Sequence, residues 1–424
     1  MNVLVVGGGA REHAICWALR RELDGGELYA APGNSGTAML ATNLPIGSDD
    51  IDRVVSATTT HSIDLVVIGP EAPLAAGLAD RLRASGRAVF GPSAGAARIE
   101  SSKAFAKDVM EKAKVPTASS RTFTELDLAL AWVDRQDPPI VVKASGLAAG
   151  KGVIICQTKQ EAQRAVTGMI RDQTFGEGGR TVVIESFLEG EELSVMAVTN
   201  GEQLLLLPAA QDHKRLLEGD KGPNTGGMGA YSPVSLATRI LLDKVERTIL
   251  RPTLDELANR GTPFTGVLYA GLMLDREGSP RVIEFNCRLG DPEAQTIIPR
   301  IRSGLLEAFH ACAVGAPLPG IEVLPVGAVT TVLATAGYPN DPRLGDVIEF
   351  EKIPESILIW HAGTQSDQRG VLRTNGGRVF SVTAIAEDIL EAQRASIAAA
   401  EAIKFQGKQF RRDIGWREAK RIRE

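Results

Sequence analysis

One stretch of the chain decides the fold: Val282-Ile-Glu284-Phe-Asn286-Cys-Arg288-Leu-Gly-Asp291-Pro-Glu293. Its β-branched beginning predicts a strand, and side chains two residues apart in a strand lie on one face. Glu284, Asn286 and Arg288 would then project together as two oxygen ligands and one fixed cation. Such a set suits a polyphosphate that carries Mg²⁺, a metal that prefers carboxylate, carbonyl and phosphate oxygens. The alternative for this stretch alone is a strand end with a surface ion pair.

Length and composition describe an ordinary globular protein of several domains. The chain has 424 residues, of which 44% are hydrophobic and 23% are charged. This length predicts roughly two to four domains. The net charge is −5 without a basic domain, so we expect no nucleic-acid partner. The C-terminus is locally basic between Lys404 and Arg423, which we interpret as a solvated helix face.

The cysteines and the N-terminus predict a cytoplasmic protein. The four cysteines lie far apart without CxxC spacing, which argues against a zinc site or a disulfide framework and fits a reducing compartment. The N-terminus lacks the charged region and apolar core of a signal peptide. No apolar run reaches about 18 residues, so we expect no membrane contact.

The first hundred residues predict a parallel sheet. Strands near 2–6, 27–31, 64–68 and 88–90 alternate with helices near 11–22, 50–57 and 74–85. Such alternation is typical of an α/β, Rossmann-like sheet with helices on both faces. We place this N-terminal domain at residues 1–102.

From about residue 117 the pattern becomes α+β. After a helix at 103–112, strands are predicted at 139–143 and 153–156, and the segments 180–187 and 192–199 predict an antiparallel pair. A polar, glycine-rich loop at 202–233, a long helix at 236–259 and strands at 268–275 and 280–286 follow. Strands at 328–335, 357–362 and 378–384 and a helix at 385–402 predict a small C-terminal α+β domain. We therefore expect a central domain at 103–316, with a mobile lobe at about 115–190, and a C-terminal domain at 320–424.

A glycine-rich hairpin loop follows the strand that ends at Lys143. Its residues Gly146, Gly150, Lys151 and Gly152 could bring backbone N–H groups and one ammonium to phosphate oxygens. It is not a Walker loop, because Gly152 stands where Ser or Thr is required. A flexible hairpin tip is the alternative. Lys143 itself needs a partner when buried, and either a phosphate or a structural carboxylate would serve.

Glu185-Ser-Phe187-Leu188 and the acidic turn that ends at Glu192 could hold a nucleoside. Phe187 and Leu188 would form an apolar slot for a base, and Glu192 would accept hydrogen bonds from a ribose. A strand end followed by a solvated acidic turn explains the segment equally well.

A second glycine-rich turn, Gly7-Gly8-Gly9-Ala-Arg11-Glu12, follows the first strand and opens a helix. Backbone N–H groups at such a place bind anions. Glu12 occupies the third glycine position of a dinucleotide fingerprint, so we favour a phosphate or sugar-phosphate site over a nicotinamide site. The polar segments 211–215 and 222–233 predict binding loops rather than spacers.

Taken in order, these features resemble the ATP-grasp ligases: a strand with a lysine, a glycine-rich hairpin, an E-x-x-L-x-x-x-E segment and a final E-x-N-x-R strand. Within that class, the chain resembles the phosphoribosylamine–glycine ligase family over essentially its whole length. The matching stretches are VGGGAREHA (6–14), GPEAPL (69–74), FGPS (90–93), SSKAF (101–105), GLAAGKGV (146–153), QDHKR (211–215), GPNTGGMGAYSP (222–233), EFNCRLGDPE (284–293) and TNGGRV (374–379).

The resemblance implies an ATP-grasp core and a reaction of de novo purine synthesis. ATP would phosphorylate the glycine carboxylate, and the amine of 5-phosphoribosylamine would then attack the acyl phosphate. Position by position, it implies that Lys103 and Lys143 contact the ATP phosphates, that Glu185, Leu188 and Glu192 hold the nucleoside, and that Glu284 and Asn286 bind Mg²⁺ or Mn²⁺. Arg288, with Asp212 and Lys214, would act at the reacting groups. The residues implied for the sugar phosphate and glycine are Gly7, Gly9, Arg11, Glu12, Asn224, Asp291, Pro292 and Glu293.

Two departures and two rival functions accompany this resemblance. The strand before Glu284 has no acid until Asp275, so a second metal site held by the protein is not expected, and Ser145 stands where an aspartate is expected. A carboxylating or formylating ATP-grasp enzyme, acting on another ribonucleotide or on biotin, is the first rival. A nucleotide-sensing protein without turnover is the second. We expect a monomer whose partners are small molecules.

Overall fold

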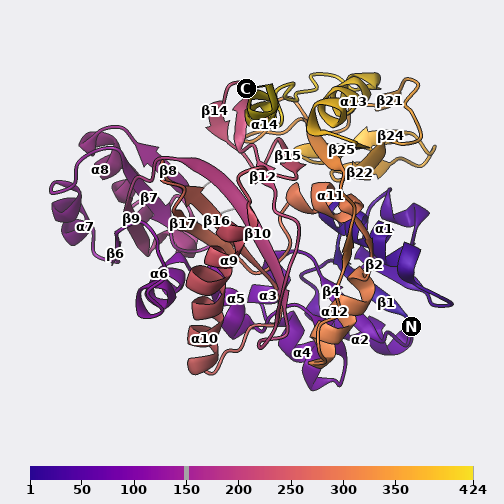
Figure 1. The fold of residues 1–424 in the computed structure, drawn as a ribbon, viewed down its shortest axis with the longest axis horizontal. Helices are drawn as coiled ribbons and strands as arrows, with labels where there is room; N and C mark the ends of the chain where they lie inside the picture. Colours follow the sequence, from indigo (N-terminus) through magenta and orange to yellow (C-terminus); the bar gives the residue numbers. More distant parts are fainter. Residues whose placement is uncertain (148–151, 424) are drawn as a thin grey trace.

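The computed structural model describes residues 1–147 and 152–423 (Figure 1). A parallel sheet at the N-terminus, an α+β lobe, a central antiparallel sheet and a C-terminal sheet follow one another along the chain. The α/β fold class predicted from the sequence is confirmed.

The N-terminal sheet has the strand order β3-β2-β1-β4-β5 and is parallel throughout. In the central strand β1 (Val3–Gly7), Leu4 and Val6 face one hydrophobic core while Val3 and Val5 face another. Both faces are therefore covered, which explains the unbroken apolar run. The other elements are β2 (Leu28–Pro32), β3 (Thr42–Asn43), β4 (Leu65–Ile68), β5 (Ala88–Phe90), α1 (Ala10–Glu22), α2 (Ile51–Thr60) and α5 (Ala94–Ser101).

The single helix predicted at 74–85 is two helices in the structure. The first, α3 (Glu71–Ala75), ends before Gly77, and α4 (Leu78–Ala84) begins after it. Gly77 has a φ of +88°, a left-handed conformation that glycine adopts without strain. The break separates α3, which begins at Glu71, from α4.

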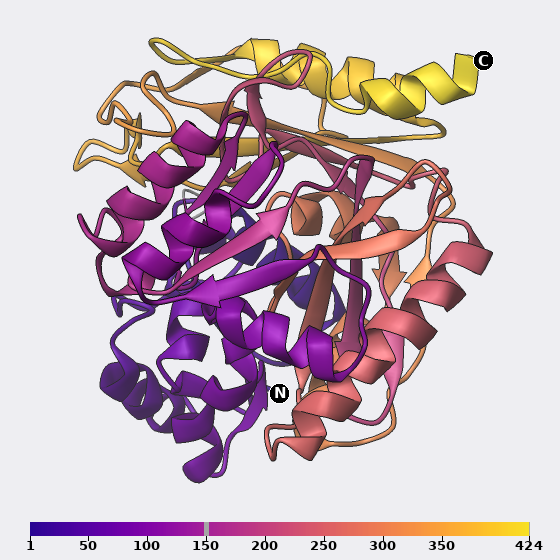
Figure 2. The ribbon, with the colours of Figure 1, turned by 90° about the vertical axis from the view of Figure 1, so that its left-hand side faces the viewer.

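The lobe is an antiparallel sheet covered on one side by two helices (Figure 2). Its strand order is β6-β9-β7-β8, and α7 (Leu126–Val133) and α8 (Lys159–Ile170) pack together on it. The lobe has a hydrophobic core of its own, which runs from Ala129 to Ile184. Its strands are β6 (Ser120–Phe123), β7 (Ile140–Ala144), β8 (Val153–Cys156) and β9 (Val182–Ser186).

The central sheet has the order β11-β10-β16-β17 and corrects one prediction. The segments predicted as an antiparallel pair are strands, but β9 pairs with β7 and β6, whereas β10 (Glu191–Thr199) pairs with β16 (Gly266–Leu274) along nine residues. Gly190 makes the change of sheet feasible, because a Cβ there would lie 1.9 Å from the Leu274 carbonyl oxygen. The sheet is completed by β11 (Leu204–Leu206) and β17 (Pro280–Asn286).

The segment 202–233, predicted as a loop, contains several short strands. Two of them, β12 (Gln211–Asp212) and β15 (Gly229–Ser232), extend the C-terminal sheet β12-β15-β20-β25-β22, and β13 (Arg215–Leu217) pairs with β14 (Lys221–Asn224). These strands were missed because they are short and lack an alternating apolar pattern, and because β15 has its second partner, β20, far along the chain. The C-terminal sheet also contains β20 (Gly327–Ala334), β22 (Leu358–His361) and β25 (Arg378–Ala386), and α13 (Ile389–Ala402) packs on it.

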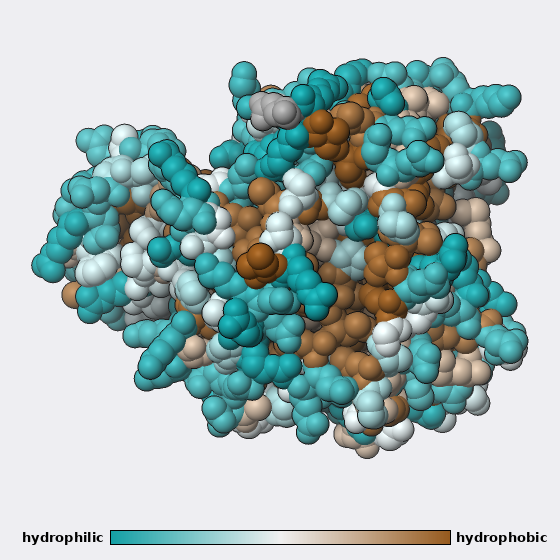
Figure 3. All heavy atoms as spheres, in the orientation of Figure 1, coloured by the Kyte–Doolittle hydropathy of each residue, from teal (hydrophilic) through white to brown (hydrophobic). Residues whose placement is uncertain are grey.

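The remaining helices frame the central domain. α6 (Lys103–Lys112) contacts β9 and β17, α12 (Leu305–Val314) covers β5, and the long predicted helix is α9 (Arg239–Val245) and α10 (Arg251–Asn259), joined by a π-helical turn. The basic C-terminus is only in part a solvated face, because Arg411 is fully buried before α14 (Trp416–Arg423). The lobe is set off from the rest of the surface in Figure 3. Among the described residues, no helix is long and apolar enough to cross a membrane.

Candidate active site

The end of β17 carries Glu284 and Asn286 on its polar face. Phe285 and Cys287, which alternate with them, are buried in the apolar core. A bulge in the β16–β17 pairing lies between these residues and the start of the strand, and the Ile283 carbonyl oxygen accepts a hydrogen bond of 3.0 Å from the Lys143 ammonium. The alternation predicted from the sequence therefore holds in the strand, and it brings Glu284 to a cluster of lysines.

Glu284 lies in the field of several cations. Burial opposes its ionisation, but Lys214, Lys103, Lys143 and Arg288 together keep the pKa of the Glu284 carboxyl below its ordinary value. The carboxylate stays ionised at neutral pH, as a metal or cation ligand must.

Lys143 has the structural carboxylate that the sequence left as an alternative to phosphate. Its ammonium lies 2.9 Å from Glu185, whose second oxygen lies 3.2 Å from Lys107 on α6. All three side chains are at least nine-tenths buried, and burial lowers the pKa of Lys107 to about 8 despite Glu185. Two lysines share one carboxylate, which leaves a net positive charge where the lobe meets the central sheet.

Lys103 begins α6 beside this cluster, and its pKa is lowered by burial although Glu284 opposes the effect. Ser145, which stands in place of an expected aspartate, contacts the same helix start. Its carbonyl accepts from the Lys103 backbone N–H at 2.8 Å and its hydroxyl accepts from the Ala104 N–H at 3.1 Å. The serine therefore fixes Lys103 relative to the lobe.

The glycine-rich hairpin is described only in part. Gly146 donates to the Gly178 carbonyl at 2.9 Å, and a Cβ on Gly146 would lie 2.5 Å from the Gly178 Cα, so the two backbones touch. Gly152 accepts a hydrogen bond from the Ala144 N–H. Gly150 and Lys151 lie outside the described residues. Phe187 is 37% exposed at the end of β9, and Leu188 is half-buried beside it.

Lys214 lies between the acidic turn that ends at Glu192 and the end of β17. Its ammonium lies 2.7 Å from Glu192 at the start of β10 and 3.9 Å from Glu284 on β17. Against the effect of burial, Glu192, Asp212 and Glu284 raise the pKa of Lys214, which therefore carries its charge at neutral pH.

Asp212 is the residue whose protonation is tuned most clearly. Burial, together with the carboxylates of Glu293, Glu192 and Glu284, raises the pKa of Asp212 to about 8, although Lys214 opposes the shift. A carboxyl group that titrates near neutral pH suits proton transfer.

Glu293 is held in a buried hydrogen-bond network. It accepts from the hydroxyl groups of Tyr269 at 2.7 Å and Ser194 at 3.0 Å. Burial and the Glu293 charge raise the pKa of Tyr269, so this hydroxyl stays a donor. Glu293 is therefore fixed beneath the site by β10 and β16.

Arg288 forms ion pairs with two carboxylates, Glu71 and Glu100, that were not predicted from the sequence. Its Nε donates to Glu71 at 3.1 Å and its Nη2 donates to Glu100 at 2.9 Å. Glu100 also accepts from the Cys287 backbone N–H at 2.8 Å. Glu71 belongs to the matching stretch GPEAPL, which was the available signal, whereas Glu100 and Lys107 gave none.

The N-terminal glycine turn is braced from inside by Glu12 and Arg11. Glu12 accepts from the Gly9 N–H at 2.7 Å and from Arg11 at 2.6 Å, and Arg11 also donates to the Leu289 carbonyl at 3.2 Å. Gly7, with a φ of +128°, lies against the Glu12 side chain. Both charged residues therefore support the turn and its contact with the segment after β17.

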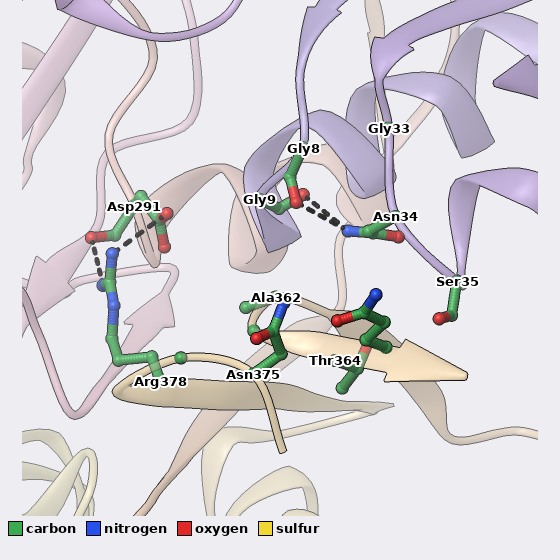
Figure 4. Close-up of a pocket in the computed structure, with 13 residues that line it drawn as sticks. Gly8, Gly9, Gly33, Asn34, Ser35, Asp291, Ala362, Thr364, Asn375 and Arg378 are labelled. Carbon is green, nitrogen blue, oxygen red and sulfur yellow. Dashed lines mark hydrogen bonds and ion pairs between the residues drawn. The ribbon is translucent and has the colours of Figure 1, made fainter. Parts of the chain in front are cut away.

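A cavity of about 600 Å³ lies between this turn and the C-terminal domain (Figure 4). Its lining comes from the glycine turn, the loop 33–35, Asp291 and the C-terminal segments 362–365 and 375–378. Asn34 donates to the carbonyl oxygens of Gly8 at 3.0 Å and His361 at 2.7 Å, which ties the two domains together. Thr364 and Asn375 lie opposite the glycine turn. The cavity is rich in hydrogen-bonding groups and poor in apolar side chains.

The segment after β17 joins the cavity to the lysine cluster. Arg378 of the TNGGRV stretch lies 3.1 Å from the Asp291 carboxylate and donates to the Asp291 and Gly226 carbonyl oxygens. Pro292 precedes α11 (Glu293–Ile297). On one side of Pro292, Asp291 lines the cavity, and on the other, Glu293 joins the hydrogen-bond network with Ser194 and Tyr269. Asn224 ends β14, and its backbone pairs with Arg215 rather than contacting the cavity.

The residues at the end of β17 fit a divalent metal that arrives with a nucleotide. Among the described residues, no three His, Cys, Asp or Glu side chains form a metal cage. Mg²⁺, however, is commonly held by one or two protein oxygens together with phosphate oxygens and water. Glu284 is 35% exposed, and its ion pair among the described residues is with Lys214 at 3.9 Å. On β16, Gly271 stands opposite Glu284, and Asp275 closes the following turn by accepting from the Glu277 and Ser279 N–H groups.

Two antiparallel sheets, one in a separate lobe, meet at Lys143 and at the end of β17, and this arrangement defines an ATP-grasp enzyme. The chain belongs to the phosphoribosylglycinamide synthetase family. The profile of the family's N domain matches residues 1–100, its ATP-grasp domain matches residues 101–294, and its C domain matches residues 328–417.

Similar proteins agree with this assignment over the full length. The chain is 45% identical over 423 residues to a phosphoribosylamine–glycine ligase of Vibrio cholerae, with 98% of each chain covered, and 44% identical over 426 residues to that of Escherichia coli K12, with 99% covered. A crystal structure of a phosphoribosylamine–glycine ligase from Thermotoga maritima has a TM-score of 0.86 and 37% identity, covering 98% of this chain and 100% of the other. A biotin carboxylase from Campylobacter jejuni, with a TM-score of 0.74 and 14% identity, covers 96% of this chain and 92% of its own, and shows the fold alone.

Proposed function

We propose that this ATP-dependent ligase joins glycine to 5-phosphoribosylamine, with glycyl phosphate as the intermediate and glycinamide ribonucleotide, ADP and phosphate as products. The observation that carries the proposal is the similarity to phosphoribosylamine–glycine ligases along the whole chain. The lysine cluster and the separate polar cavity of this structure are consistent with it. An ATP-grasp site next to a second, anion-binding cavity suits a reaction with three substrates.

In the first step a glycine carboxylate oxygen attacks the γ-phosphorus of ATP, and the bond to the β-phosphate oxygen breaks. Lys103 and Lys143 hold the phosphates and offset the charge that moves onto ADP. Gly146 and Gly152, on either side of the glycine-rich loop, approach the phosphates. Phe187 and Leu188 receive the base, while Glu192 accepts from the ribose hydroxyl groups.

Glu284 and Asn286 would hold Mg²⁺ or Mn²⁺. When bound, this ion neutralises phosphate charge and orients the terminal phosphates for in-line transfer. Ionised Glu284 suits this role because the surrounding cations keep its pKa low.

In the second step the amine of phosphoribosylamine attacks the acyl carbon, the C–O bond to phosphate breaks, and the amine loses a proton. Asp212 accepts that proton in its ionised form, which its pKa of about 8 makes the major form only above pH 8, while Lys214 offsets the charge of the leaving phosphate. Arg288 stabilises the oxyanion of the tetrahedral intermediate. Glu293 fixes the substrate amine from below.

The cavity between the domains would bind the sugar phosphate. Although the Gly9 N–H is bound by Glu12, the glycine turn offers the other backbone N–H groups at the start of α1, a place that favours anions. Thr364 and Asn375 offer hydroxyl and amide groups across the cavity. Asp291 would face the ribose, which leaves Glu293 and Asp212 for the amine and glycine.

The proposal includes the domain limits 1–102, 103–316 and 320–424, and closure of the lobe at about 115–190 over ATP. The separate core of the lobe supports such closure. We also propose that the enzyme works as a cytoplasmic monomer.

Acceptor-dependent ADP release tests the function. With ATP, Mg²⁺ and phosphoribosylamine, glycine is expected to start steady ADP and phosphate release, and bicarbonate, formate or biotin is not. ADP release with bicarbonate in place of glycine would assign the chain to a carboxylating reaction. Nucleotide binding without turnover would assign it to a sensing protein.

A further inference from the structure

The C-terminal segment, residues 411–421, lies against the short strands that carry Asp212 and Lys214. Figure 1 shows α14 beside β14 and β12. The match to the family's C domain ends at residue 417, within this segment. Its charged side chains were expected to be solvated, yet several of them contact the loops of the site.

Arg411 is the centre of these contacts. Its guanidinium is 0% exposed, and it donates to the Arg215 carbonyl at 3.1 Å, to Asp220 at 2.9 Å and to Asp413 at 2.7 Å. Asp413 in turn accepts from the Gly219 N–H at 2.8 Å. A buried guanidinium with hydrogen bonds in several directions fixes the backbone of residues 215–220.

His213 provides a second contact between the segment and the site. Its Nε2 accepts from the Gly415 N–H at 3.3 Å. Burial lowers the pKa of His213 to about 3, so the ring is a neutral acceptor in ordinary buffers. The flanking side chains, Asp212 and Lys214, are directed toward the carboxylates of the site.

The far end of the segment contacts Glu191, the residue before the partner of Lys214. Arg421 pairs with Glu191, the first residue of β10, and with Glu418 at 3.1 Å. Glu418 accepts from the Ser235 N–H and hydroxyl groups at 3.2 and 3.1 Å. Glu192, which follows Glu191, is the carboxylate that lies 2.7 Å from Lys214.

We propose that the C-terminal segment is a positioning element for the ligase reaction, in which Arg411 and Arg421 hold the chain on either side of the Lys214–Glu192 pair. Arg411 acts through the backbone of Arg215, the neighbour of Lys214, and Arg421 acts through Glu191. Neither residue touches the reacting groups. The inference rests on the role proposed for Lys214.

Arg411→Lys tests one end of the segment. A lysine keeps the charge but lacks the planar fork, so the backbone at Arg215, next to Lys214, loses part of its support. Small displacements of a reacting group cost large factors in rate, and we expect kcat to fall about tenfold while KM for ATP changes less than about twofold. Arg412→Lys is the matched control, since the Arg412 side chain pairs with Glu401 and not with the β13–β14 pair. Its kcat is expected to stay unchanged.

A double substitution separates positioning from general stability. In a Lys214→Met background, Arg411→Lys is expected to have no further effect on kcat, because the group it positions is already gone. A full tenfold loss on top of Lys214→Met would mean a structural role only, and it would overturn the proposal. If Lys214→Met alone leaves kcat unchanged, the proposed role of Lys214 fails instead.

Arg421→Gln probes the other end and serves if Arg411→Lys does not fold. Its guanidinium is 24% exposed, so the change leaves no deeply buried charge. We expect Arg421→Gln to raise KM for ATP about threefold, through Glu192. It is also expected to lower kcat in the enzyme that retains Lys214 but not in the Lys214→Met variant. An unchanged KM and kcat would contradict the proposal.

Discussion

Arg288 gives the sharpest kinetic prediction, because its two carboxylate partners require the geometry of a guanidinium, whereas its proposed role requires only a positive charge. The structure places its Nε 3.1 Å from Glu71 and its Nη2 2.9 Å from Glu100. In Arg288→Lys, one compact ammonium replaces the fork and can satisfy only one of these carboxylates well. In Arg288→Met, the charge is lost entirely.

The two substitutions predict graded losses of rate. A hydrogen bond to a charged group contributes about 2 kcal/mol, so losing one of the two contacts in Arg288→Lys predicts a kcat lower by roughly 30-fold. A cation about 4 Å from an oxyanion contributes on the order of 4 kcal/mol at an effective dielectric of 20, so Arg288→Met predicts a loss of roughly 10³-fold. The ATP dissociation constant is expected to change less than about threefold in both, because the charge acts on the acyl-transfer step.

Steady-state ADP release gives kcat, and calorimetric titration with a non-hydrolysable ATP analogue gives the dissociation constant. Arg260→Lys is the matched control, since Arg260 is also held by two carboxylates, Glu256 and Asp108, away from the site. Equal losses in ATP affinity and kcat would refute the reasoning and make Arg288 a nucleotide-binding residue. Similar kcat values for the lysine and methionine variants would also refute it, because charge would then have no role.

Three further predictions concern the metal, the domain interface and the cavity. Glu284→Gln is expected to raise the Mn²⁺ concentration needed for half-maximal activity about tenfold or more, because a neutral amide replaces an ionised ligand; an unchanged titration removes it from the metal site. Burial lowers the pKa of His13 to about 3 and of His361 to about 4, from 6.5, so the neutral rings stabilise the fold fully above pH 6.5 and this contribution is lost as pH falls toward 4. Between pH 6.5 and 4, the free energy of unfolding, measured by urea unfolding, is therefore expected to fall by about 3 kcal/mol less in His361→Gln than in the unchanged protein. The same fall in both proteins would contradict a neutral, buried His361. Asn34→Asp would place a carboxylate against the Gly8 and His361 carbonyl oxygens, so KM for phosphoribosylamine is expected to rise about tenfold with KM for ATP unchanged, and a rise in both would argue against a separate sugar-phosphate cavity.

The parts of the fold that depend on local pattern could be predicted from the sequence. The strand Pro280–Asn286 and the helix Lys103–Lys112 have the predicted bounds, because apolar alternation and good helix formers act over a few residues. The pairing of the strands around Gly190 could not be predicted. It depends on whether β10 bonds to its neighbour in sequence or to β16, which lies some 70 residues further along.

The candidate site shows the same limit. Glu284 and Lys143 stand in recognisable strand patterns, but Lys107 lies on an ordinary helix and becomes part of the cluster only because Glu185 folds against it. Arg411 was assigned to a solvated face, since a run of basic residues is usually exposed. It is buried because Asp220, distant in sequence, provides a charge partner.

The central claim is that Glu284 and Asn286 hold a divalent ion against the terminal phosphates of ATP, beside the glycine carboxylate. A crystal grown with Mn²⁺, a non-hydrolysable ATP analogue and glycine tests it directly, through the anomalous scattering of manganese. The account predicts a manganese peak bound by the Glu284 carboxylate and the Asn286 amide oxygen, with phosphate oxygens completing its coordination. A peak held elsewhere, with Glu284 still turned to Lys214, would contradict it.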